Sequence, residues 1–278
     1  MQPVQPLLTA HLFPELLDAL LALLTTLSDE EWQRPTVCAG WSVKDVALHL
    51  LGDDVGILSR QRDNFRLPGQ AVADWADLVA LINGLNAQWV QATRRTSPRL
   101  LCDLLAVTGQ QVCDYVATRD PFALGGAVSW AGPDAAPVWL DLAREYTERW
   151  HHQQHIRDAV NRPGLKAPRY LTPVLDTFLR ALPHTFRAVP AETGAVVTLH
   201  ITGDAGGQWH LVRTADAWQL MTGPAPQPTT VVELDQESAW RLLTKGVDPN
   251  VKPAGVPLTI TGDQRLGQQV YNAVSIIA

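Results

Sequence analysis

The spacing of apolar residues changes once along this chain of 278 residues, near Pro190, and this change limits the fold more than any other feature. Before it, leucines and other apolar residues recur three, four and one positions apart, which is typical of one wide helical face. After it, apolar and polar residues alternate in short runs separated by turn-forming glycines and prolines, as in strands. The sequence therefore predicts an α-helical part followed by an α+β part.

The first part predicts a series of helices with clear start and stop signals. One covers residues 12–27. The second begins at Ser42, whose hydroxyl is a good N-cap, with Asp45 three residues further on as in a capping box. The segment 121–137, rich in Gly and Pro, is predicted as a loop. Further helices are expected over residues 74–95, 97–120, 138–160 and 172–186.

The second part predicts a sheet with helices packed against it. Strands are expected over residues 195–201, 209–213, 217–221, 229–234 and 257–261. Helices are expected over residues 236–245 and 264–277. We predict one domain over residues 1–165 and a second over residues 166–278, of which residues 166–190 form a bridging helix.

The composition excludes several classes of function. The formal net charge is −6 and no long basic run occurs, which argues against nucleic acid or an anionic membrane as the partner. The three cysteines are an odd number and fit a reducing compartment better than a disulfide framework. Glu15 and Asp18 interrupt the first apolar stretch, so it predicts neither a signal peptide nor a membrane span. We therefore expect a cytoplasmic protein that is a monomer or a homodimer.

A cluster of metal-ligating residue types lies in the helix predicted over residues 138–160, in the sequence ERWHHQQH. Glu148 and His152 are four positions apart, so one helical face can present both to one metal ion. His49, in the helix that begins at Ser42, can supply a third ligand from across a helical bundle. Two imidazoles and one carboxylate suit zinc, and also iron or nickel, and leave positions open for catalysis. The alternative is a solvated Glu–His pair and an unrelated packed histidine.

Further residues are candidates for the surroundings of such a site. Asp53 shares a helical face with the first histidine and either orients its imidazole or is an exposed carboxylate. His155 can join the site. Cys38 is a nucleophile, an extra ligand or a small residue of a turn, and Trp41 lines a pocket or is structural. Arg157 anchors a substrate or is a cation near the carboxyl end of its helix.

Two motifs resemble those of a known family. The sequence PTVCAGWSVKDVALH (residues 35–49) resembles the signature of the DinB-like, mycothiol-dependent maleylpyruvate isomerase family, in which a Cys-x-Gly-Trp turn opens the helix with the first metal-binding histidine. The sequence from Glu148 to His152 is similar to the second metal-binding element of that family. Residues 258–263 and 274–278 resemble parts of the sterol-carrier-like domain that follows the bundle in many members. The resemblance implies a DinB-like four-helix bundle, with the three candidate ligands named above holding a divalent metal at one end.

The resemblance also implies an activity. A metal-bound thiol is deprotonated at neutral pH, and the family uses a low-molecular-weight thiol such as mycothiol as co-substrate. We therefore expect a thiol-dependent isomerase or S-transferase that acts on a small electrophile, as maleylpyruvate isomerase does. The isomerase of the family also uses an arginine of its second domain, for which Arg213, Arg241 and Arg265 are candidates. Arginine outnumbers lysine and alanine is abundant, which favours a bacterial source in which such a thiol replaces glutathione.

Two other classes of function stay open. A sterol-carrier-like sheet can hold an apolar ligand or lipid, with the helical domain as a metal-containing regulatory partner and no catalysis. This alternative predicts a co-purified lipid and no dependence on thiols. A purely structural bundle predicts no bound metal.

Overall fold

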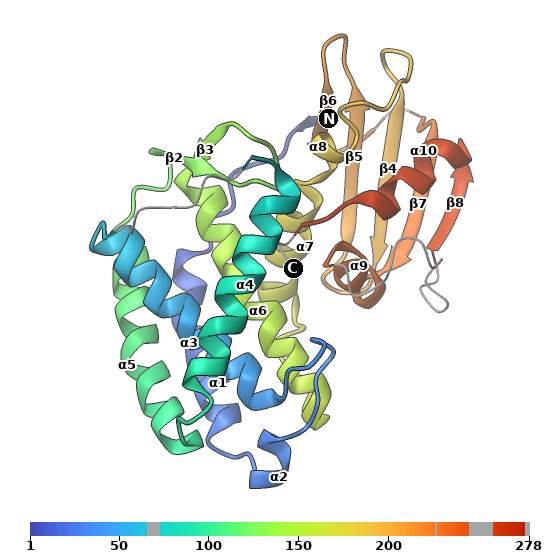
Figure 1. Cartoon of the computed structure of the whole chain (residues 1–278). Coiled ribbons are helices and arrows are strands. Elements are labelled where there is room, and N and C mark those ends of the chain that lie inside the picture. The colour runs from blue at the N-terminus through green and yellow to red at the C-terminus, as the bar shows by residue number, and fades with distance from the viewer. Residues whose placement is uncertain (66–72, 226, 245–257, 276–278) are drawn as a thin grey trace. The chain divides into compact units, whose positions relative to one another are not determined.

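The chain divides into two compact units that alternate along the sequence (Figure 1). The computed structural model describes residues 1–65, 73–225, 227–244 and 258–275. One unit, here called the helical unit, consists of Thr9–Pro121 and Glu145–Gly164. The other, here called the sheet unit, consists of Met1–Leu8, Phe122–Arg144 and Leu165–Ile277. The chain therefore leaves the sheet unit after residue 8 and returns to it twice.

The helical unit is built around one apolar core. Its elements are η1 (Ala10–Leu12), α1 (Phe13–Leu24), α2 (Asp29–Trp32), α3 (Val43–Ile57), η2 (Leu58–Arg62), α4 (Trp75–Thr93), α5 (Pro98–Ala117) and, from Glu145 onward, α6 (Val138–Val160). The long helices predicted from the apolar spacing are all present, with ends that differ by a few residues. Each places side chains in the same core, among them Leu24, Leu48, Val90, Leu101 and Ile156. Among the described residues, none of the helices combines the length and apolar content that a membrane crossing needs.

The start of α3 is held by the capping box that the sequence predicts. The Ser42 side chain accepts a hydrogen bond from the Asp45 amide at 3.3 Å, and the Ser42 amide donates to Asp45 Oδ2 at 3.0 Å. The same carboxylate binds the guanidinium of Arg94 through two contacts of 2.9 and 3.0 Å. Trp89 of α4 also donates its indole N–H to the carbonyl of Leu48 at 2.8 Å. These bonds set where α3 begins and hold it against α4, which places His49 two turns along the helix.

We expect replacement of Asp45 by asparagine to lower the free energy of unfolding by about 2 kcal/mol at pH 7, because it weakens a helix cap and a two-point ion pair. Burial raises the pKa of Asp45, but the bonds from Arg94 and Ser42 outweigh burial and hold it below its ordinary value. A depressed pKa in the folded state stabilises the fold above the unfolded-state value of about 4, and this stabilisation is lost as pH falls through the folded-state pKa.

Urea unfolding of wild type and Asp45→Asn at pH 7 and at pH 3 measures this contribution, and the difference between the two proteins should shrink at pH 3. Asp103→Asn, which changes an exposed carboxylate of α5, is the control with almost no expected effect. An equal difference in the free energy of unfolding at both pH values would show that the ionised carboxylate of Asp45 does not stabilise the fold.

The sheet unit contains a six-stranded sheet in the order β1-β6-β5-β4-β7-β8. Its strands are β1 (Gln2–Pro3), β4 (Val196–Thr202), β5 (Gly207–Arg213), β6 (Trp218–Thr222), β7 (Thr230–Asp235) and β8 (Leu258–Gly262). β4 and β7 pair in parallel and the other neighbours pair antiparallel. The helices of this unit are α7 (Pro168–Leu179), α8 (Leu182–Thr185), α9 (Gln236–Leu243) and α10 (Gln264–Gln268). The change of apolar spacing near Pro190 therefore predicts the position of five of the six strands, and β1 at the amino terminus is the exception.

Several local predictions are corrected by the structure. The predicted loop 121–137 contains a short hairpin of β2 (Leu124–Ala127) and β3 (Ala135–Pro137). The predicted helix 172–186 is two helices, because Pro183 cannot continue a helix and stands in the first turn of α8. The predicted helix 264–277 ends with α10, and a 3₁₀ turn, η3 (Gln269–Asn272), follows. Residues 245, 257 and 276–277 of the predicted elements lie outside the described residues.

Candidate metal centre

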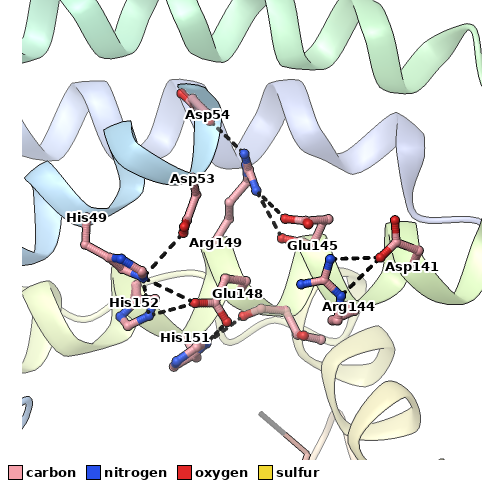
Figure 2. A network of polar contacts seen from close by, with 11 residues as sticks. His49, Asp53, Asp54, Asp141, Arg144, Glu145, Glu148, Arg149, His151 and His152 are labelled. Atoms are coloured by element: carbon pink, nitrogen blue, oxygen red, sulfur yellow. Dashed lines mark hydrogen bonds and ion pairs between the residues drawn. The ribbon is translucent and has the colours of Figure 1, made fainter. Parts of the chain in front are cut away.

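Three donor atoms converge where α3 faces the middle of α6 within the helical unit (Figure 2). Nε2 of His49 lies 3.1 Å from Nε2 of His152 and 3.3 Å from Oε1 of Glu148. The same carboxylate oxygen lies 3.0 Å from Nε2 of His152. Both histidines are buried, with exposed fractions of 4% and 8%. The structure thus brings together the three residues that the sequence analysis selects as ligands.

The chemistry of this donor set fits a divalent cation. Each of the three atoms has a lone pair that points toward the other two. One or two shared protons cannot give every lone pair a hydrogen-bond partner, because some pair of atoms is then left with two lone pairs or two like charges in contact. Ligands of a tetrahedral zinc ion with bonds of about 2.1 Å lie roughly 3.4 Å apart, close to the distances here. A carboxylate oxygen of Asp53 lies beside these three donors. Its buried Oδ2 is 3.4 Å from Nε2 of His49 and has no hydrogen-bond partner among the described residues.

The electrostatics of the cluster keep protons off two of its three donors and hold a proton on the third. Burial, assisted by the charge of neighbouring His151, lowers the pKa of His152 to about 3. Burial opposes ionisation of Glu148, but the surrounding histidines outweigh it and hold its pKa well below the ordinary value. Burial also disfavours the charge on His49, but Asp53 and Glu148 outweigh it and raise its pKa to about 9. One imidazole and the carboxylate are therefore free of protons at neutral pH.

The neighbouring candidates occupy distinct places around the cluster. Asp53 contacts the His49 nitrogen that faces the other two donors, so its carboxylate is near the centre and not on the far side of the ring. Nδ1 of His151 lies 3.0 Å from the carbonyl oxygen of Thr147 and 3.9 Å from Oε2 of Glu148, so His151 is beside the cluster but is not one of its three converging donors. The ring of His155 meets that of His152 edge to face with centroids 5.2 Å apart, and its Nδ1 is 3.2 Å from the sulfur of Cys38. His155 and Cys38 thus form a second group of donors beside the first.

Trp41 links the cluster to the surface. Its ring packs on the ring of His49 with the centroids 5.2 Å apart. It also lines a surface cavity of about 430 Å³ together with residues of the turn before α3 and with Arg94. The pocket-lining role predicted for Trp41 agrees with this position.

Arg157 binds groups outside the cluster. Arg157 donates to the carbonyl of Ala19 and to the side chain of Gln153, both at 3.2 Å, and so ties the carboxyl-terminal half of α6 to α1. These contacts favour the interpretation of Arg157 as a cation near the end of its helix over that of a substrate anchor. The three second-domain candidates, Arg213, Arg241 and Arg265, all belong to the sheet unit.

A buried charge network next to the cluster is a feature that the sequence analysis missed. Arg149, only 13% exposed, contacts Asp54 at 2.6 Å and Glu145 at 3.1 Å. Asp54 also accepts a hydrogen bond from the Thr108 hydroxyl at 2.9 Å. The network joins α6, α3 and α5, and Figure 2 shows Arg149 between Asp54 and Glu145. Two adjacent carboxylates inside an otherwise apolar helix, Asp53 and Asp54, are the signal that could have pointed to it.

Known proteins share this architecture. A family model described as the mycothiol maleylpyruvate isomerase N-terminal domain matches residues 13–157. One similar structure is a crystal structure of a mycothiol-dependent maleylpyruvate isomerase in which one histidine is replaced by alanine; it has a TM-score of 0.54 and 11% sequence identity. A second crystal structure, described as the mycothiol-dependent maleylpyruvate isomerase with no substitution named, has a TM-score of 0.52 and 13% identity. Each comparison covers 90% of this chain and 91% of the other. No curated protein sequence matches the chain.

The two kinds of comparison support different statements. At such low identity the crystal structures show a shared fold, a mixture of helices and a sheet. The family model extends further, because it spans just over half of the chain and includes both helices that bear the clustered histidines. The chain therefore belongs to the family of the mycothiol maleylpyruvate isomerase N-terminal domain.

Proposed function

We propose that this protein is a metal-dependent enzyme that uses a low-molecular-weight thiol, mycothiol or a similar compound, to isomerise a small electrophile. The observation that supports it most is the convergence of His49, Glu148 and His152, whose donor atoms lie 3.0–3.3 Å apart in a buried place. Zinc is the metal that this donor set suits best, and nickel and iron are the alternatives. Three protein ligands leave an open position for a substrate thiol.

The proposed chemistry divides between the metal and the chain. A bound divalent cation lowers the pKa of a coordinated thiol and so supplies a thiolate at neutral pH. The thiolate adds to one carbon of an activated cis double bond, the resulting single bond rotates, and loss of the thiolate restores the double bond in the trans form. The thiol is not consumed. Asp53, whose carboxylate lies 3.4 Å from Nε2 of His49, is the group placed to accept the thiol proton.

The surroundings of the cluster suit a polar thiol. The cavity beside Trp41 is lined by Lys44, Ser42 and Arg94 and by backbone of the preceding turn. Hydroxyl-rich thiols such as mycothiol need donors and acceptors of this kind, whereas an apolar ligand does not. The alternative of a lipid-binding module without catalysis receives no such support from the helical unit.

The finer architecture is part of the proposal. We infer that the helices of the first part form a DinB-like four-helix bundle and that the sheet is sterol-carrier-like, with residues 1–165 and 166–278 as the corresponding domains. The two crystal structures support a common fold over nine-tenths of the chain, 90% in each comparison. A bacterial cytoplasm and a monomeric or homodimeric state complete the proposal.

An isomerisation assay tests this function. Zinc-loaded protein is incubated with maleylpyruvate and with mycothiol, and the trans product is followed by its absorbance. We expect turnover that needs both the thiol and the metal and that falls at least about 100-fold in Glu148→Gln, because loss of a ligand removes the metal.

The control is Glu30→Gln, which changes an exposed carboxylate of α2 and should leave turnover unchanged. A parallel assay with the thiol and a small electrophile that has no double bond to isomerise distinguishes S-transfer from isomerisation. No thiol-dependent reaction of either kind in zinc-loaded protein, together with a co-purified lipid, would contradict the proposal and favour the binding module.

A further inference from the structure

His152 has one ring nitrogen that the first cluster does not use. Its Nε2 faces His49 and Glu148, whereas its Nδ1 is buried and has no hydrogen-bond partner among the described residues. A histidine that binds a metal through one nitrogen almost always donates the other N–H to a carboxylate or carbonyl. Since His152 is only 8% exposed, an unpaired N–H at this position is costly. The structure thus lacks the usual partner where one is most expected.

Donors of a different kind lie close to His152. One donor atom from each of Cys38, His152 and His155 lies within 4.8 Å of the other two. The sulfur of Cys38 is 3.2 Å from Nδ1 of His155, and the rings of His152 and His155 meet edge to face with centroids 5.2 Å apart. Because Nε2 of His152 belongs to the first cluster, Nδ1 is the nitrogen left for the second group.

We propose that Cys38, His155 and Nδ1 of His152 form a second metal site, which takes a soft divalent cation such as zinc and shares His152 with the first site. One thiolate and two imidazole nitrogens are donors that zinc and other soft cations prefer. The site rests on the proposed first site only through the shared residue. A second cation here also explains why Nδ1 has no protein partner.

Binding at this site changes protons in a defined way. The Cys38 thiol loses its proton, and His152 loses its remaining N–H when both nitrogens bind metal, so two protons leave as one divalent cation enters. The bridging imidazolate then joins two cations that repel each other, so the second ion binds more weakly than the first. Cys38 and His155 are half-buried, which leaves a path for an ion from solvent.

Cobalt titration of metal-free, reduced protein tests the second site. A thiolate ligand gives a charge-transfer band in the near ultraviolet that oxygen and nitrogen ligands do not give. We expect two equivalents of cobalt to bind, with the thiolate band growing only during the second equivalent. In His49→Ala we expect one equivalent to remain and to show the thiolate band from the start.

Two variants remove the second site and leave the first. Cys38→Ser and His155→Ala should each bind one equivalent of cobalt, without the thiolate band, and keep at least most of the first-site affinity. Cys102→Ser, which changes a free cysteine of similar exposure in α5, is the matched control and should behave as wild type. Circular dichroism of each metal-free variant checks that it is folded.

The outcomes separate this proposal from the proposed function. A single equivalent in wild type, with or without the thiolate band, would overturn the second site, because a band at one equivalent means that Cys38 ligates the first ion. Two equivalents with the band retained in Cys38→Ser would also overturn it. Failure of the first site has a different signature, which is wild-type stoichiometry in His49→Ala.

Discussion

His49→Ala is expected to lower the affinity of the first site for zinc about 1,000-fold. Structural zinc sites in proteins are worth roughly 10–16 kcal/mol, so loss of one of three protein ligands removes about 4 kcal/mol, or about three orders of magnitude. His49 is the one donor of the first cluster that α3 supplies. Its removal leaves Glu148 and His152 on one helix, which is the weak two-ligand arrangement that many helices contain.

Competition with a chromophoric chelator measures this change at fixed pH and ionic strength. His11→Ala, which removes an exposed histidine of the same unit, controls for weak surface binding and should keep the wild-type affinity. Elemental analysis of both purified variants gives the stoichiometry independently. Unchanged affinity and content in His49→Ala, with an unchanged circular dichroism spectrum, would show that α3 does not contribute to the metal site.

Arg149→Met is expected to lower the free energy of unfolding by about 3–5 kcal/mol, the usual cost of breaking a buried ion pair by removing one partner. The substitution keeps most of the aliphatic volume and removes the charge. Asp54 and Glu145 then keep buried carboxylates, only 5% and 8% exposed, without their cation. Burial works against the charge of Arg149, but both carboxylates raise its pKa far above the ordinary value, so arginine is charged at every pH of interest.

Thermal and urea unfolding of metal-free protein measure this cost, with a chelator present so that loss of metal does not contribute. A fall in Tm of about 10 °C corresponds to the expected change for a unit of this size. Arg62→Met removes an exposed arginine that pairs with Asp63 and should change stability by less than about 1 kcal/mol. Arg149→Met combined with Asp54→Asn should recover part of the loss, whereas equal loss in the single and double variants would contradict the network.

The predicted helices agree with the structure where local signals are strong. The capping box at the start of α3 is local chemistry and is present as expected, and Pro98 stands in the first turn of α5, where a helix accepts proline. The hairpin β2–β3 was missed because its strands are only four and three residues long and hold Gly and Pro. Strand β1 was missed because two residues have no periodicity; its place depends on backbone bonds that β6 offers.

The residues of the candidate site also differ in how far the local sequence predicts them. The positions of Glu148 and His152 follow from helical spacing alone, so their shared face was predictable. His49 was a candidate third ligand from its place on a helix, and the resemblance supported it. Its distance from the other two donors came from the packing of α3 against α6. The pairing of Cys38 with His155 and the salt bridge of Arg149 with Asp54 join residues far apart in sequence, for which no local pattern exists.

The order of helices and strands, the start of α3 and the face shared by Glu148 and His152 are properties of short stretches of chain, because caps, turns and periodicity act over a few residues. The interleaving of the two units and the convergence of donors from α3 and α6 depend on how distant segments of the chain pack. Packing sums many weak contacts over the whole unit, so only the tertiary structure decides which nitrogen of His152 meets which neighbour.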